Sequence, residues 1–153
     1  MSLSRNRILN EVRDSATLND PDVKLTPKDN FYEWEAVING PTDTPYENGS
    51  FKLSIHCPMN YPISPPIVHF LTRCFHPNIN FLTGELCLDL LKSNWTPAWT
   101  ILYICKAIIY MLGEPNAESP LNCDAGNLIR EGDIRGFNSL AKMYTHELAM
   151  SGF

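Results

Sequence analysis

Two stretches of alternating apolar and polar residues constrain the fold of this chain more than any other feature. Every second side chain is apolar in residues 31–39 and again in residues 51–56. This period of two is typical of strands that bury one face. The spacers at 40–45 and 47–49 are rich in Gly, Pro, Asn and Asp, which favour turns. Such short connections predict antiparallel strands, with these residues facing inward: Tyr32, Trp34, Ala36, Ile38, Phe51, Leu53 and Ile55.

Helical patterns lie on both sides of the predicted strands. The apolar spacing predicts an amphipathic helix over residues 3–18, capped by Ser2 or Ser4, and a second helix after Thr100 that ends at Gly113. Further elements are expected at 23–25 and 67–71 (strands) and at 124–130 and 134–150 (helices). Strands followed by helices predict an α+β protein, with helices on one face of a four-stranded antiparallel sheet. The 153 residues contain no repeat or linker, which predicts a single domain spanning residues 1–153.

Composition and charge exclude several classes of function. The net charge of −5 argues against binding to a nucleic-acid backbone, which requires a basic face. The most apolar run, residues 99–112, is interrupted by Lys106 and is too short to insert into a membrane. The five cysteines are widely spaced, form no CxxC pair and follow no signal segment. These features predict a reduced, intracellular protein without a disulfide framework.

Cys87 is the cysteine whose surroundings favour chemistry. It lies in residues 72–99, a long stretch without periodicity, and follows a Pro-stiffened turn that contains Asn78. A thiolate can hold an activated carboxyl group, and an amide N–H can stabilise an oxyanion. The other cysteines are expected to be small core residues, because this residue type is usually buried: Cys57, Cys74, Cys105 and Cys123.

Two other kinds of site, a zinc site and a cysteine-protease site, lack residues that they require. Cys74 and His76 form a lone C-x-H pair, whereas structural zinc requires four ligands, so no metal site is predicted. A protease of the papain type requires a histidine that is oriented by a third group. His76 is locked in front of a proline, and no other histidine stands out.

Motifs along nearly the whole chain resemble those of the ubiquitin-conjugating enzymes. They are Trp34-Glu35-Ala36, Gly40-Pro41, Thr44-Pro45-Tyr46-Glu47, Tyr61-Pro62, Pro65-Pro66, His76-Pro77-Asn78, Gly84-Glu85-Leu86-Cys87-Leu88-Asp89, Trp95-Thr96-Pro97-Ala98, Glu114-Pro115-Asn116 and Ser119-Pro120-Leu121. Each motif alone is weak, but their order and intervals are specific. Residues 119–133, and one extra residue between Asn78 and Cys87, are similar to the peroxisomal, peroxin-type members.

The resemblance implies a role for each matching position. Cys87 would accept the ubiquitin C-terminus as a thioester from a ubiquitin-activating enzyme, which consumes the ATP, so no cofactor is needed. Asn78 would stabilise the oxyanion that forms during transfer, or it would brace the loop that carries Cys87. Both roles stay open. His76 is expected to be structural. Arg5, Ile63, Pro97 and Ala98 match the surface where RING-type ligases dock and which the activating enzyme overlaps.

Ser119 departs from the family pattern, in which many members carry Asp beside the thioester. This position forms the gate through which the acceptor approaches the thioester. We expect a gate without the charge of Asp to suit a thiol acceptor. The ordinary pKa values of about 8.5 for Cys and 10.4 for Lys make a thiol easier to ionise by roughly 2.6 kcal/mol. The alternative is that Ser119 only caps the following turn.

The resemblance to the peroxin-type members implies that ubiquitin is transferred to a cysteine or lysine of a peroxisomal import receptor. This transfer would allow the receptor to be recycled. The partners would be peroxisomal RING ligases and a membrane-anchored peroxin that holds this cytoplasmic enzyme at the cytosolic face of the peroxisome. Rival interpretations are a conjugating enzyme of another pathway or modifier, and an inactive scaffold. The scaffold is disfavoured because Cys87 is present.

Overall fold

The computed structural model describes residues 2–150, and the predicted elements are present with small changes at their ends. The strands and helices, in chain order, are α1 (Leu3–Ala16), β1 (Val23–Pro27), β2 (Glu33–Asn39), β3 (Ser50–His56), β4 (Ile67–Phe70), the 3₁₀ helix η1 (Asp89–Leu91), α2 (Ile101–Gly113), α3 (Cys123–Arg130) and α4 (Ile134–Leu148). The α+β class, with four α-helices and four strands among the described residues, is therefore confirmed.

The sheet is the predicted antiparallel meander, with the strand order β1-β2-β3-β4. Trp34 lies opposite Ile55, and Ala36 lies opposite Leu53. These four side chains are at most 1% exposed. The alternation in the sequence decides which face of β2 and β3 is buried, and the connection between the two strands then sets the register.

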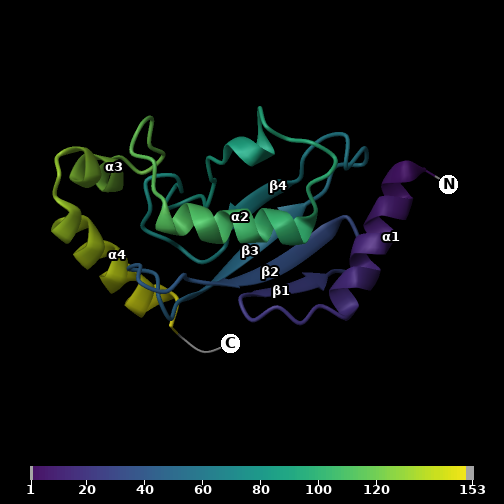
Figure 1. The fold of residues 1–153 in the computed structure, drawn as a ribbon, viewed down its shortest axis with the longest axis horizontal. Helices are drawn as coiled ribbons and strands as arrows, with labels where there is room; N and C mark the ends of the chain where they lie inside the picture. Colours follow the sequence, from purple (N-terminus) through teal and green to yellow (C-terminus); the bar gives the residue numbers. More distant parts are fainter. Residues whose placement is uncertain (1, 151–153) are drawn as a thin grey trace.

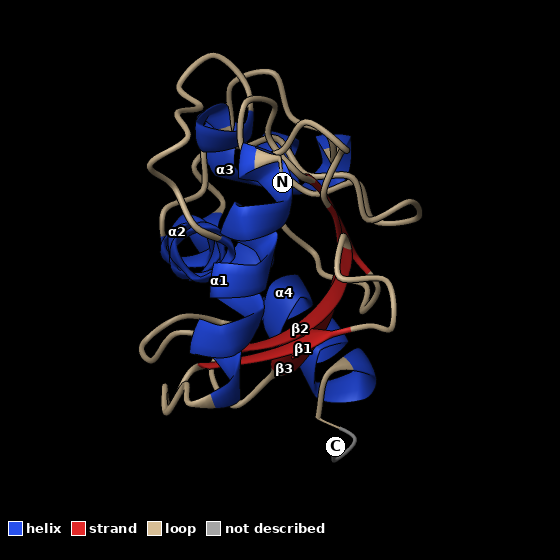
Figure 2. Ribbon diagram, turned by 90° about the vertical axis from the view of Figure 1, so that its right-hand side faces the viewer, coloured by secondary structure: helices blue, strands red, loops and turns tan. Residues whose placement is uncertain are grey.

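Helix α2 covers the inner face of the sheet (Figures 1 and 2). Thr100 is its N-cap, as predicted, and accepts a hydrogen bond from the backbone N–H of Tyr103. The side chains that α2 buries are Ile101, Ile104, Cys105, Ile108, Met111 and Leu112. This apolar side explains why the helix forms against the sheet rather than in solution.

Helices α1 and α4 lie at opposite ends of the sheet (Figure 1). Ser2 caps α1 by accepting from the backbone N–H of Arg5, which settles the choice between Ser2 and Ser4. Among the described residues, no helix is both long enough and apolar enough to cross a bilayer. Within residues 2–150, His, Cys, Asp and Glu side chains do not gather in a group of three or more that could hold a metal ion.

Three of the four cysteines that were expected in the core are buried, and burial raises the pKa of each thiol. The pKa of Cys57 and of Cys105 rises to about 12, and that of Cys74 is also raised. The expectation for Cys123 is wrong, because this side chain is exposed at the first position of α3.

Candidate active site and docking surface

The segment that carries Cys87 is held by backbone pairing rather than by a regular element. Leu86 forms an isolated antiparallel bridge with Ile79, and the backbone N–H of Cys87 donates to the Asn78 carbonyl at 2.8 Å. Gly84 anchors the segment to the end of β4, because its carbonyl accepts from Phe70 N–H at 2.8 Å. A Cβ at Gly84 would lie 1.9 Å from the Phe70 carbonyl oxygen, and its φ is +75°. Only glycine fits this close approach.

Cys87 is half-buried and lines an open cleft of about 500 Å³. The other walls come from η1, from α2 and from the segment 114–119. Of the five thiols, Cys87 and Cys123 are not buried. Cys87 lines this cleft together with Asn78, whereas Cys123 lines a separate hollow with Asn80 and Asn122. Lys92 also reaches Cys87, with Nζ 4.0 Å from Sγ. The sulfur atom is therefore at the wall of a cleft that is open to solvent.

Asn78 braces the loop through its side-chain amide. Its Oδ1 accepts from the backbone N–H of Asn116 at 2.9 Å, and its Nδ2 donates to the Asn116 carbonyl at 2.8 Å. The side chain is only 6% exposed. An amide nitrogen carries two hydrogens, and the bond to Asn116 uses one of them. The bracing role is therefore present in the structure, and one N–H is left for a further acceptor.

His76 is structural, as predicted. It is fully buried; its Nε2 lies 2.9 Å from the Met111 carbonyl, and its Nδ1 accepts from the backbone N–H of Asn78 at 3.0 Å. Burial lowers the pKa of His76 to about 4, although the bond to the Met111 carbonyl opposes this change. The ring is therefore neutral at physiological pH, and its two bonds require the proton to be on Nε2. His76 thus ties the loop before Cys87 to helix α2.

Ser119 lines the same cleft as Cys87 and Asn78. It is exposed and has a φ of 51°, in the left-handed region that disfavours most residues except Gly, Asn and Asp. The cap of the following helix is Asn122, which accepts from the backbone N–H of Ala125. Ser119 is therefore not the cap of α3, and its alternative role at the turn that directly follows it stays a prediction.

The docking residues Ile63, Pro97 and Ala98 are exposed on two neighbouring loops, and Ile63 is 70% exposed. Trp95 joins these loops, because its Nε1 donates to the Pro62 carbonyl at 3.0 Å. Its ring also packs on Tyr61, with centroids 6.1 Å apart. Trp95 therefore packs the two loops together, and Ile63, Pro97 and Ala98 present an apolar patch to solvent.

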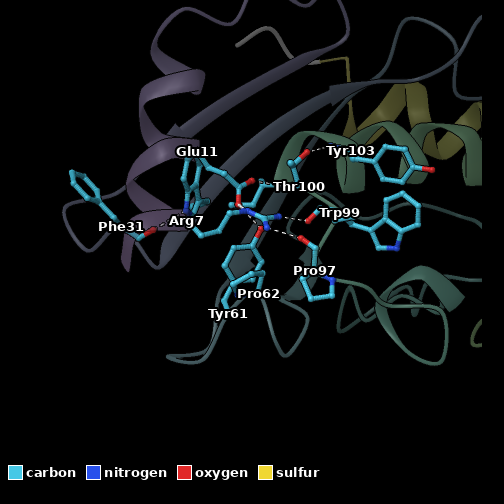
Figure 3. Close-up of polar contacts among 12 residues, drawn as sticks. Arg7, Glu11, Phe31, Tyr61, Pro62, Pro97, Trp99, Thr100 and Tyr103 are labelled. Atoms are coloured by element: carbon cyan, nitrogen blue, oxygen red, sulfur yellow. Dashed lines mark hydrogen bonds and ion pairs between the residues drawn. The ribbon is translucent and has the colours of Figure 1, made fainter. Parts of the chain in front are cut away.

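Arg7, rather than Arg5, connects helix α1 to this surface (Figure 3). The Arg7 guanidinium donates to the Pro97 carbonyl at 2.5 Å and to the Trp99 carbonyl at 2.6 Å. The Arg7 side chain is partly buried in this arrangement. Arg5 is exposed on the first turn of α1. Charge periodicity on α1 could not distinguish the two arginines, because the two carbonyls that Arg7 binds lie 90 and 92 residues away.

Glu11 is a structural residue near the docking surface that sequence reasoning missed. Its carboxylate is almost fully buried and accepts from Arg7 Nε at 2.9 Å, from the Tyr61 hydroxyl and from the backbone N–H of Ile101 at 2.7 Å. One carboxylate therefore joins α1, the loop before Ile63 and the first turn of α2 (Figure 3). These charge-assisted bonds compensate for the cost of burying a charge.

Comparison with known proteins agrees with this geometry. The family model described as "Ubiquitin-conjugating enzyme" matches residues 7–145. The chain is 51% identical to Protein PEROXIN-4 of Arabidopsis thaliana over 98% of both chains. It is 57% identical to the ubiquitin-conjugating enzyme E2 pex4 of Dictyostelium discoideum, over 81% of this chain and 85% of that protein.

Two solved structures have the same fold over nearly the whole chain. A putative ubiquitin-conjugating enzyme from Plasmodium yoelii has a TM-score of 0.91 and 35% identity, and covers 99% of both chains. Pex4p of H. polymorpha, solved in complex with the soluble domain of Pex22p, has a TM-score of 0.90 and 32% identity, over 97% of this chain and 99% of that one. With its fold, its motifs and its accessible thiol in agreement, this chain belongs to the ubiquitin-conjugating enzyme family, whose members are transferases that act through a cysteine thioester.

Proposed function

We propose that Cys87 is the residue that accepts ubiquitin as a thioester from a ubiquitin-activating enzyme and passes it to an acceptor. The observation that carries this proposal is the position of Cys87, half-buried in an open cleft beside the Asn78 amide. Three of the other thiols are buried with raised pKa values, which makes them poor nucleophiles. Cys123 is exposed but does not line this cleft.

Asn78 has two compatible roles in this proposal. The bonds to Asn116 hold its side chain in place, and the second Nδ2 hydrogen is free to donate to the oxyanion that forms during transfer. A donor that is already held in position costs little reorganisation. Substitution Asn78→Ala should therefore slow discharge by roughly 10²-fold or more, and part of the loss would come from the loosened loop.

We further propose that this enzyme acts in the peroxisomal pathway. The similarity to the PEROXIN-4 and pex4 proteins supports transfer to a peroxisomal import receptor with the help of peroxisomal RING ligases, which recycles the receptor. The Pex4p–Pex22p complex supports a membrane-anchored recruiter that holds this enzyme at the cytosolic face of the peroxisome. Ile63, Pro97 and Ala98 would contact the ligase.

A loading assay tests the role of Cys87. The protein is incubated with activating enzyme, ATP and ubiquitin, and the products are separated with and without reducing agent. We expect an adduct that reductant removes, that is absent in Cys87→Ala and that persists in the matched control Cys123→Ala. Loading of Cys87→Ala, or loss of the adduct in Cys123→Ala alone, would refute the assignment.

The proposal for Ser119 is that a gate without a carboxylate favours a thiol acceptor. The test compares discharge of the loaded enzyme to free cysteine and to free lysine before and after Ser119→Asp. Asn and Asp both tolerate the left-handed backbone found here, so Ser119→Asn is the matched control without the charge. We expect Ser119→Asp alone to increase discharge to lysine relative to cysteine. An unchanged ratio would contradict the idea.

The alternative function is conjugation of another modifier, or action in another pathway. Loading assays with other ubiquitin-like proteins and their own activating enzymes distinguish the modifier. Binding to the soluble domain of a membrane-anchored peroxin, measured by calorimetry, distinguishes the pathway. Loading with another modifier but not with ubiquitin would favour the alternative.

A further inference from the structure

Asn78 and Cys87 lie opposite each other at the base of one short hairpin, residues 78–87. The Cys87 N–H donates to the Asn78 carbonyl at 2.8 Å, and the neighbouring pair, Ile79 and Leu86, forms an antiparallel bridge. Such pairing fixes the two sides of a hairpin relative to each other. A movement of the hairpin as a body therefore shifts the Asn78 amide and the Cys87 sulfur atom relative to the other walls of the cleft.

The tip of the hairpin is closed by its own hydrogen bonds. The side-chain oxygen of Asn80 accepts from the N–H groups of Leu82 at 2.9 Å and of Thr83 at 3.0 Å. The backbone N–H of Asn80 donates to the Glu85 carbonyl at 2.7 Å, and the Asn80 carbonyl accepts from Gly84 N–H at 2.9 Å. Asn side chains stabilise turns in this way. The hairpin is therefore stiff, and a displacement of its tip is transmitted to its base.

Tyr144 of α4 contacts both the tip of this hairpin and the chain that leads into it. The centroid of the Tyr144 ring lies 4.9 Å from that of Phe81 and 5.5 Å from that of Phe75. Aromatic rings attract each other at these separations. Phe75 lies three residues before Asn78, and Phe81 lies three residues after it. One side chain of α4 therefore supports the backbone on both sides of Asn78.

We propose that Tyr144 is a positioning residue for the transfer of ubiquitin. Its ring holds the hairpin in the place where the second Nδ2 hydrogen of Asn78 meets the oxyanion that forms at the Cys87 thioester. Tyr144 does not line the cleft, so it acts through Asn78 rather than on the reacting atoms. This inference rests on the proposed roles of Cys87 and Asn78.

The support from Tyr144 is stronger than a second contact of the Phe81 ring. The Arg73 guanidinium lies 5.8 Å from the centroid of this ring, but Arg73 is exposed, and cation–π attraction is weak at exposed sites. Phe75, by contrast, is 6% exposed, and its carbonyl accepts from the Tyr46 hydroxyl at 2.6 Å. Phe75 is thus fixed in the core, and Tyr144 connects it to the tip of the hairpin.

The expected effect of removing this ring lies between no effect and complete loss of the oxyanion donor. A donor acts at about 2.7–3.1 Å from the oxyanion, and a displacement of about 1 Å can slow a reaction roughly 10²-fold. The substitution Tyr144→Leu removes the ring but keeps the bonds between Asn78 and Asn116. We therefore expect discharge to slow about tenfold, which is less than the loss expected for Asn78→Ala.

The experiment is a double-mutant cycle on single-turnover discharge of the loaded enzyme to free lysine, without ligase. The four proteins are the wild type, Tyr144→Leu, Asn78→Ala and the double variant, and each rate is divided by the amount of thioester present. If Tyr144 acts through Asn78, Tyr144→Leu slows discharge about tenfold in the wild type and less than about twofold in Asn78→Ala. Equal slowing in both backgrounds would show that Tyr144 does not act through Asn78, and would overturn the inference.

Three control variants separate positioning from a general loss of stability. Tyr144→Phe keeps the ring and should discharge within about twofold of the wild type. Phe81→Leu removes the other ring of the pair and should reproduce Tyr144→Leu, which keeps the test open if Tyr144→Leu does not fold. Val23→Ala removes buried packing from β1, at the opposite edge of the sheet from β4, and should lower the urea midpoint without slowing discharge.

The outcomes distinguish this inference from the function on which it rests. Wild-type discharge in folded Tyr144→Leu, or in Phe81→Leu, while Asn78→Ala is slow, overturns this inference alone. The same holds if Tyr144→Phe is as slow as Tyr144→Leu, or if Val23→Ala slows discharge equally. Failure of the wild type to form the thioester, or wild-type discharge in Asn78→Ala, overturns the proposed function and this inference with it.

Discussion

Acidification should destabilise this protein through His76. The pKa of its imidazole is lowered from the ordinary value of 6.5 to about 4, mainly by burial. As the pH falls, the unfolded chain therefore binds a proton near pH 6.5, and the folded protein binds one only near pH 4. The stability that the neutral ring contributes is complete above pH 6.5 and is lost as the pH falls towards 4.

The size of the effect follows from the two pKa values. At about 1.4 kcal/mol for each pKa unit, the total loss is about 3 kcal/mol. About 2 kcal/mol of it falls between pH 7 and pH 5. The charged ring would also lose the lone pair on Nδ1 that accepts from Asn78 N–H, so the loop before Cys87 should loosen in the same pH range.

Urea unfolding followed by circular dichroism at pH 7 and at pH 5 measures this loss. The matched variant is His76→Asn, whose side-chain oxygen can accept from the same N–H but does not titrate. All other titrating groups cancel when the pH dependence of the variant is subtracted from that of the wild type. We expect a difference of about 2 kcal/mol. Equal pH dependence in the two proteins would show that the buried imidazole is not responsible.

Three further substitutions test the fold and the surfaces around the site. Gly84→Ala should destabilise the protein by more than about 2 kcal/mol in thermal unfolding, because its Cβ would collide with the Phe70 carbonyl. The same substitution should reduce the rate of ubiquitin loading. Wild-type loading and stability would contradict this. Arg7→Lys should cost about 1–2 kcal/mol of stability, because lysine cannot donate to the Pro97 and Trp99 carbonyls in the forked geometry of a guanidinium. It should also reduce ligase-stimulated discharge more than spontaneous discharge. An equal effect on both discharge rates would exclude a role in docking. Ile104→Ala, at a fully buried position of α2, should cost about 2–5 kcal/mol in urea unfolding, and a cost below 1 kcal/mol would mean that the core collapses around the gap.

The sequence alone determined the elements whose signal is local. Alternation placed Trp34 and Ala36 on the buried face of β2, and Thr100 marked the start of α2. The motifs around Cys87 are sufficient to indicate the family, since their order and spacing are linear properties of the chain. The exposed loop at Ile63 agrees with the prolines around it, because each proline removes a donor that a central strand requires.

Only the tertiary structure decided which polar groups meet across the fold. Glu11 is a charged residue on an amphipathic helix, and nothing local distinguishes it from a solvated one until residues 61 and 101 are placed beside it. The bonds between Asn78 and Asn116, and between Arg7 and Trp99, likewise join positions 38 and 92 residues apart. Periodicity reports which side of an element faces inward, but the partner on that side depends on how the elements pack, and that packing is a property of the whole chain.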